Sequence, residues 1–271
     1  MSNLEGVRFI VIDTETTGID SSKDHVVEIA ITKMLGNQTK LSYDQLINPG
    51  IPIPPEVSGI HGIADWDVEG KPSLFEVWDD IMPMIEKADV LVAHNAPFDR
   101  SFLPETNKPW LDTLRFAQQI WPDAPNYKNQ TLRFWKNLRM NGDAHRAGFD
   151  TMVTAKLLQL MLKDYLQRGY GDDLDTLLAW IQRPVLIRKM TFGKYYGTPM
   201  EDVPLDYMEW ALRNVTNDKM TEDMRWTMES MLLKQRNPSQ KDNHVKGSWV
   251  QNVTQNKSSD EKNLNQFSIE T

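Results

Sequence analysis

Hydrophobic and polar positions alternate in a strand-like pattern over the first part of the chain. Residues 8–13, 26–34 and 41–47 are rich in apolar and β-branched side chains, and short polar or glycine-containing turns separate them. These three segments predict three successive strands. Residues 89–95 form another apolar run, which fits a buried strand.

Helical periodicity dominates the segments around and after this fourth run. Apolar residues recur at helical spacing over residues 73–87, and residues 97–105, 112–121 and 149–168 are further predicted helices. Three consecutive strands followed by alternating strands and helices are typical of an α/β domain. We therefore expect a mixed β-sheet flanked by helices.

The chain is predicted to divide into three parts. Residues 1–183 form the main domain, and residues 184–236 form a small α+β unit that contains a β-hairpin closed by Gly193 and Gly197, followed by a short helix. Residues 237–271 are rich in Asn, Ser, Gln and Lys and poor in aliphatic side chains. That composition predicts a disordered polar tail.

The amino-acid composition excludes several classes of protein. The 271 residues are 40% hydrophobic, which is enough for a real core, and the absence of cysteine excludes disulfides, thiol catalysis and Cys-ligated metals, as fits a reducing cytoplasm. There is no bilayer-length apolar run and no signal-peptide pattern, so we expect no membrane partner. The net charge of −8 disfavours a protein that coats nucleic acid non-specifically, but it allows local binding to one end of a nucleic-acid strand.

Two carboxylates stand at the end of the first predicted strand. Asp13 and Glu15 follow the apolar run "FIVI" and are two residues apart, so they project from the same face of the strand. Like charges this close cost stability unless a cation lies between them. The pair alone is equally compatible with a solvated strand end and with a metal site.

Two more acids lie on helical stripes. Asp99 precedes Phe102 at helical spacing, and Asp150 precedes Val153 in the same way, so both face the predicted core. Each alone could be a satisfied buried group or an acid in the first turn of a helix. Four acids at one core edge have a common explanation as ligands of Mg²⁺ or Mn²⁺. His145, five residues before Asp150, could be a surface side chain or a general base.

The segments that carry these residues are "DTETTG", "HNAPFD" and "HRAGFD". In this order and spacing they resemble the three motifs of the DEDDh, or DnaQ-like, 3′→5′ exonuclease family. The stretch "EVSGIHGIADWDVEGKPSLFEV" is similar to the corresponding segment of epsilon-type proofreading subunits. Residues 110–122 and 183–214 resemble enzymes of the exodeoxyribonuclease X type within this family.

The resemblance implies an RNase H-like fold and a specific division of roles. Asp13, Glu15, Asp99 and Asp150 would hold two Mg²⁺ or Mn²⁺ ions, with Asp13 between them, and His145 would deprotonate the attacking water. In-line hydrolysis at a DNA 3′ end would then release 5′-mononucleotides. The implied setting is DNA repair or recombination.

The resemblance also implies contacts to the substrate. The expected substrate-binding residues are Thr14, Thr16, Ile19, Glu56, His61 and Asn95. Among them, Ile19 would be an apolar wedge against the terminal base. His61 could instead be a turn residue packed by its isoleucine neighbours, and Asn95 could simply cap the helix that follows.

The 184–236 unit pairs basic with aromatic residues. Arg188, Lys189 and Lys194 are interleaved with Phe192, Tyr195 and Tyr196, a combination that suits phosphates and bases. The alternative is that these aromatic residues pack on the following helix.

Three other functions remain open at this point. The chain could be a polymerase-associated proofreading exonuclease, an exoribonuclease, or a non-catalytic nucleic-acid-binding module on the same fold. A protein partner is not identified by the sequence.

Overall fold

The computed structural model describes residues 4–216 and 219–236, and the chain divides into two compact units. Unit 1 is Met1–Arg183 and unit 2 is Pro184–Thr271, and each is described by itself. The expected polar tail at 237–271 lies outside the described residues.

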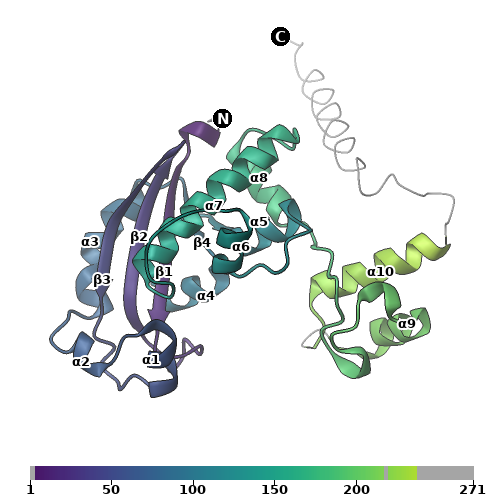
Figure 1. Ribbon diagram of the computed structural model, residues 1–271, viewed down its shortest axis with the longest axis horizontal. Coiled ribbons are helices and arrows are strands. Elements are labelled where there is room, and N and C mark those ends of the chain that lie inside the picture. Colours follow the sequence, from purple (N-terminus) through teal and green to yellow (C-terminus); the bar gives the residue numbers. More distant parts are fainter. Residues whose placement is uncertain (1–3, 217–218, 237–271) are drawn as a thin grey trace, which may run out of the picture. The chain divides into compact units, whose positions relative to one another are not determined.

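A five-stranded mixed sheet forms the centre of unit 1 (Figure 1). Its strands are β1 (Arg8–Thr16), β2 (Val26–Leu35), β3 (Gln38–Leu46), β4 (Val90–Ala93) and β5 (Trp110–Asp112), in the order β3-β2-β1-β4-β5. β1, β2 and β3 pair antiparallel, whereas β4 and β5 run parallel to β1. The parallel strands β1 and β4 therefore present their carboxyl ends at the same edge of the sheet.

Helices cover both faces of this sheet. In chain order the helices of unit 1 are η1 (Leu4–Gly6), α1 (Pro55–His61), α2 (Asp65–Val68), α3 (Leu74–Glu86), α4 (Ala96–Phe102), α5 (Thr113–Ile120), α6 (Asn129–Trp135), α7 (Ala147–Gln167) and α8 (Leu174–Ile181). Buried residues of α5, α7 and α8 share one core cluster, and those of α3 belong to a second cluster on the other face (Figure 1).

The central strand β1 contributes to both clusters because its side chains alternate. Phe9 and Val11 lie in the cluster with α7, and Ile10 and Ile12 lie in the cluster with α3. A strand covered on both faces needs apolar residues at every position, which accounts for the uninterrupted "FIVI" run. By the same alternation, the next odd position, Asp13, points to the α7 side.

Unit 2 is helical within the described residues. It contains η2 (Gly193–Tyr195), η3 (Met200–Asp202), α9 (Leu205–Asn214) and α10 (Glu222–Arg236), and an isolated bridge joins Lys189 to Pro199. Its core is dominated by methionine: Met190, Met200, Met208, Met220, Met224 and Met228 are all buried. These unbranched side chains fill the irregular space between short elements.

The structure confirms the mixed sheet flanked by helices and corrects some details. The short strand β5 was missed because residue 112 was assigned to the start of a helix, and α1, α2, α6 and α8 were not predicted. The expected hairpin is present only as a minimal one: an antiparallel bridge joins Lys189 to Pro199, Met190 exchanges backbone hydrogen bonds with Thr198 and Gly197, and a 3₁₀ turn forms the tip. The ring of Tyr195 lies 4.7 Å from that of Tyr207, so the turn also packs on α9, as expected.

A carboxylate-rich candidate active site

The carboxyl end of β1 and the first turn of α7 meet on one face of the sheet. Asp13 and Glu15 continue the odd-numbered side of β1, which packs against α7, and Asp150 lies in the first turn of that helix. One ligand atom each from Glu15, His145 and Asp150 lies within 4.8 Å of the others. Residues 135 positions apart in the chain are therefore neighbours here.

Asp99 reaches the same edge from α4, which follows β4. Its Oδ1 accepts hydrogen bonds from the backbone N–H of Thr14, at 3.0 Å, and from the Thr14 hydroxyl, at 2.9 Å. These bonds tie α4 to β1 between Asp13 and Glu15. All four predicted acids thus converge on the edge where β1 and β4 end.

Burial raises the pKa of each of the four acids, and for Asp13 and Glu15 the neighbouring acids add to the rise. Burial and the negative charges of Asp99, Glu15 and Asp150 raise the pKa of Asp13 well above its usual range. Burial, with Asp150 and Glu28 nearby, raises the pKa of Glu15 to about 8. The pKa of Asp99 rises to about 7, chiefly through burial, although its bonds to Thr14 oppose the rise.

Such a cluster is stabilised by a cation. Oxygen ligands on opposite sides of a Mg²⁺ ion lie about 4.2 Å apart, which is close to the spacing within the group of Glu15, His145 and Asp150. Within the described part of the chain no other group of three or more His and acidic side chains is this close. The donor set, mainly carboxylate oxygen, fits Mg²⁺ or Mn²⁺.

Two further contacts orient Asp150. Gln130 on α6 donates to Oδ1 at 2.5 Å, and the backbone N–H of His145 donates to Oδ2 at 2.8 Å. Burial raises the pKa of Asp150, and the bond from Gln130 opposes this rise because it favours the ionised form. Sequence reasoning missed Gln130 because α6 was not predicted and 20 residues separate the pair.

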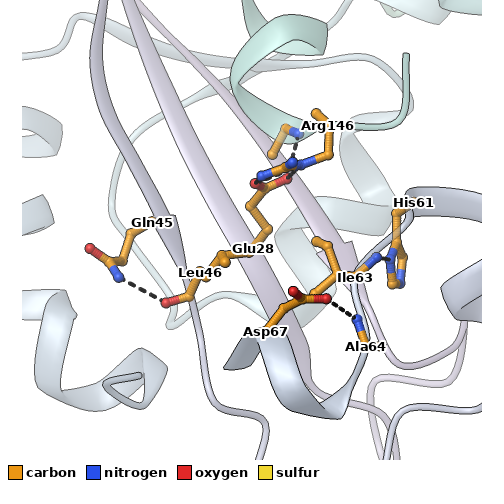
Figure 2. Close-up of polar contacts among 9 residues, drawn as sticks. Glu28, Gln45, Leu46, His61, Ile63, Ala64, Asp67 and Arg146 are labelled. Atoms are coloured by element: carbon orange, nitrogen blue, oxygen red, sulfur yellow. Dashed lines mark hydrogen bonds and ion pairs between the residues drawn. The ribbon is translucent and has the colours of Figure 1, made fainter. Parts of the chain in front are cut away.

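A second missed residue is Glu28, which lies opposite Glu15 in the register of β1 and β2. Figure 2 shows its carboxylate meeting the guanidinium of Arg146, with 2.6 Å between Oε1 and Nη2. The available signal was a single acid within the otherwise apolar start of the second strand, "VVEIAI". Buried acids in such a position are almost always paired.

The predicted substrate residues fall into two groups. Ile19, Glu56 and Asn95 are exposed, and the Ile19 side chain, 88% accessible, is free to meet a substrate. Asn95 makes no side-chain capping bond and its φ is +77°, so the capping alternative for this residue is wrong. These three remain predicted contacts.

Thr14, Thr16 and His61 are buried. The Thr14 and Thr16 hydroxyls bond to Asp99 and to the Gly18 carbonyl, respectively. The Nδ1 of His61 accepts the N–H of Ile63 at 3.0 Å (Figure 2), and its Nε2 makes no hydrogen bond among the described residues, although the Thr16 backbone is near. Burial favours a structural role for the His61 side chain.

In unit 2 some of the basic and aromatic residues make cation–π contacts with one another. The Lys194 Nζ lies 4.8 Å from the ring centroid of Tyr195 and 5.5 Å from that of Tyr207. Tyr195 packs on α9 as the alternative reading expected, whereas the Tyr196 side chain is 76% exposed.

Comparison with known sequences identifies the family. The family model described as an exonuclease, RNase_T, matches residues 10–158, which include all four acids and His145. Exodeoxyribonuclease 10 of Escherichia coli strain K12 is 32% identical over 231 residues, which cover 82% of this chain and 97% of that protein. This chain belongs to the exonuclease family. The expected membership of the DnaQ-like 3′→5′ exonucleases, with similarity to exodeoxyribonuclease X, is thereby confirmed.

Other relatives of this exonuclease are parts of larger proteins or solved structures. A PolC-type DNA polymerase III of Bacillus subtilis is 32% identical over 184 residues, which cover 64% of this chain but 13% of the polymerase. A solved structure of exonuclease X in complex with 5′-overhanging duplex DNA is 30% identical, with a TM-score of 0.53, over 63% of this chain and 98% of that one. Escherichia coli exonuclease I in complex with a dA16 oligonucleotide, at 14% identity and a TM-score of 0.51 over 64% of this chain and 45% of that one, shares the fold. Among the described helices, none combines the length and apolar character needed to cross a bilayer.

Proposed function

We propose that this exonuclease is a metal-dependent 3′→5′ exodeoxyribonuclease that releases 5′-mononucleotides from DNA. The observation that carries the proposal is the convergence of four largely buried carboxylates, each with a raised pKa, at the edge of the sheet. DNA as substrate is supported by the exodeoxyribonuclease relative that matches over most of both chains. The similar exonuclease X is bound to 5′-overhanging duplex DNA, in which the 3′ end is recessed.

Asp13, Glu15, Asp99 and Asp150 would hold two Mg²⁺ or Mn²⁺ ions. When bound, such ions orient the scissile phosphate and stabilise the charge that develops on the incoming and leaving oxygens. Thr14 holds Asp99 in place through two hydrogen bonds, and Gln130 holds Asp150. These bonds fix the carboxylates before substrate arrives, so little reorganisation is needed at the moment of reaction.

His145 would act as the general base. Its side chain is exposed, yet one of its ring nitrogens lies within 4.8 Å of ligand atoms of Glu15 and Asp150. A base in this position can take a proton from the attacking water and release it to solvent.

The proposed setting is DNA repair or recombination in the cytoplasm, which the absence of cysteine suits. The second candidate is a polymerase-associated proofreading exonuclease. It is favoured by the PolC-type relatives, which contain a matching segment of similar length. RNA is the other candidate substrate, because the phosphodiester chemistry is common to both nucleic acids.

The test is digestion of 3′-labelled and 5′-labelled oligonucleotides as single-stranded DNA, duplex DNA and RNA. We expect label to leave a 3′ end first as mononucleotide in Mg²⁺ or Mn²⁺, with no release in EDTA. An Asp13→Ala variant prepared in parallel identifies contaminating nuclease. Binding of DNA without any release of nucleotide would instead support the non-catalytic module, and preferred digestion of RNA would replace the DNA assignment.

A further inference from the structure

The backbone at His145 adopts a conformation that is uncommon outside glycine. The φ angle of His145 is +61°, in the left-handed region that non-glycine residues rarely occupy. The segment between α6 and α7 that carries it contains no helix or strand. Contacts from elsewhere must therefore hold this turn in its observed shape.

Glu28 of β2 supplies those contacts to the two residues that follow His145. Its Oε1 accepts from the Arg146 Nη2 at 2.6 Å and Nε at 3.0 Å (Figure 2). Its Oε2 accepts the backbone N–H of Ala147 at 2.8 Å. One carboxylate thus holds a side chain and the first N–H of α7. Arg146 itself offers no side-chain cap to the helix, so Glu28 does this from another element.

A carboxylate at position 28 carries a free-energy cost, because the position is buried among apolar residues. Glu28 is 1% exposed, and its neighbours Val27 and Ile29 are fully buried apolar residues. Burial of the Glu28 charge costs free energy that burial of an apolar side chain of the same size does not, and its partner Arg146 is partly exposed. Stability of β2 therefore does not explain why an acid and an arginine meet here, whereas control of the adjacent turn does.

The rest of the turn is held independently of Arg146. A side chain at Gly142 would come within 2.1 Å of the Phe149 ring, so the segment packs closely against α7 at that point. Phe149 and Asp150 are buried in the first turn of α7. Loss of the Arg146 side chain should therefore release the turn around His145 without unfolding the helix.

We infer that Glu28 and Arg146 are positioning residues for His145: the ion pair between the buried Glu28 carboxylate and the partly exposed Arg146 guanidinium holds the turn that places its imidazole beside Glu15 and Asp150. The inference rests on the proposed function for its catalytic consequence, because the pair acts through His145 and touches no reacting atom. Neither residue is among the four acids or the base of the proposed mechanism.

The test compares two arginine variants of the full chain. Arg146→Ala breaks the pair at the site, and the matched control Arg8→Ala breaks the Arg8–Asp89 pair, also bidentate, at the opposite end of β1. Arg146→Ala should lower kcat about 10- to 100-fold with KM changed less than about twofold, as expected for a supporting partner of a catalytic group. Arg8→Ala should leave both constants unchanged. Arg146→Lys keeps the positive charge but lacks the planar guanidinium that donates two hydrogen bonds side by side, so it should recover part of kcat.

A double-mutant cycle separates positioning from a general structural effect. In a His145→Ala background the Arg146→Ala change should slow the reaction by less than about twofold, because the group through which Arg146 acts is already gone. If the two losses multiply instead, Arg146 acts by another route and the inference is overturned.

Amide hydrogen exchange provides a readout that does not depend on activity. The His145 N–H donates to Asp150 in the intact turn, so Arg146→Ala should speed exchange over residues 143–147 by about tenfold or more, with β1 unchanged. Unchanged protection there overturns the positioning role, whatever the kinetics. Faster exchange in a protein whose wild type releases no nucleotide would retain the positioning role and reject the proposed function. Should Arg146→Ala fail to fold, Arg146→Lys and Glu28→Gln carry the same measurement.

Discussion

Replacing Glu15 with glutamine removes one titratable carboxyl group from the carboxylate cluster while keeping the size of the side chain. In the folded, metal-free protein Glu15 holds its proton up to about pH 8, whereas the group ordinarily loses it near 4.5. The folded state therefore binds more protons than the unfolded state between these values. Over that range the free energy of unfolding must fall as the pH rises.

The size of the effect follows from the same two values. At 1.36 kcal/mol per pH unit, the rise in the pKa of Glu15 costs the metal-free protein about 3 kcal/mol at pH 7 and about 5 kcal/mol above pH 8. Glu15→Gln avoids this cost. We expect the variant to be more stable than the wild type by about 3 kcal/mol at pH 7 and of equal stability near pH 4.5.

The assay is urea unfolding in EDTA, followed by far-UV circular dichroism at pH 4.5, 7 and 8.5. Glu105→Gln, which neutralises an exposed acid outside the site, is the matched control and should leave the urea midpoint unchanged. Added Mg²⁺ or Mn²⁺ should stabilise the wild type more than Glu15→Gln, since the wild type has the charge to neutralise. Equal urea midpoints for wild type and Glu15→Gln at pH 7 would show that the pKa of Glu15 is not raised in the folded protein, and would refute this reasoning.

Three further outcomes are expected. Gln130→Leu removes the bond that favours ionised Asp150, so the pKa of that acid should rise and the acid limb of the kcat/KM profile should move to higher pH. Ile19→Ala should slow digestion of duplex ends more than of single strands, with the urea midpoint unchanged because the side chain is exposed. Replacing Arg188, Lys189 and Lys194 together with alanine should weaken DNA binding and reduce the slope of log K against log salt concentration by about 2. Fluorescence anisotropy at several salt concentrations measures this slope. An unchanged slope would show that these three residues of unit 2 do not contact DNA.

The carboxylate site could be predicted from sequence because its members follow local rules. Asp13 and Glu15 come directly after a continuous apolar run, and Asp99 and Asp150 lie on helical stripes that face the sheet. The repeat of a strand or helix determines which way each side chain points, and parallel strands place their carboxyl ends at the same edge of the sheet.

The supporting contacts could not be predicted because they join positions with no local relation. Glu28 meets Arg146 across 118 residues, and Gln130 reaches Asp150 from a helix whose pattern is too short to detect. In unit 2, the glycines around Tyr195 predicted the turn of a hairpin, which the structure has as a single antiparallel bridge between Lys189 and Pro199. Turn composition does not encode how far the pairing extends beyond the turn.

The methionine-rich interior of unit 2 bears on how that part of the chain can diverge. Flexible thioether side chains refill small gaps left by a changed neighbour, whereas the β-branched residues of the central sheet pack in single rotamers. Substitutions within unit 2 should accordingly be tolerated more often over generations. Its exposed surface is then free to acquire new preferences while the nuclease site in unit 1 is conserved.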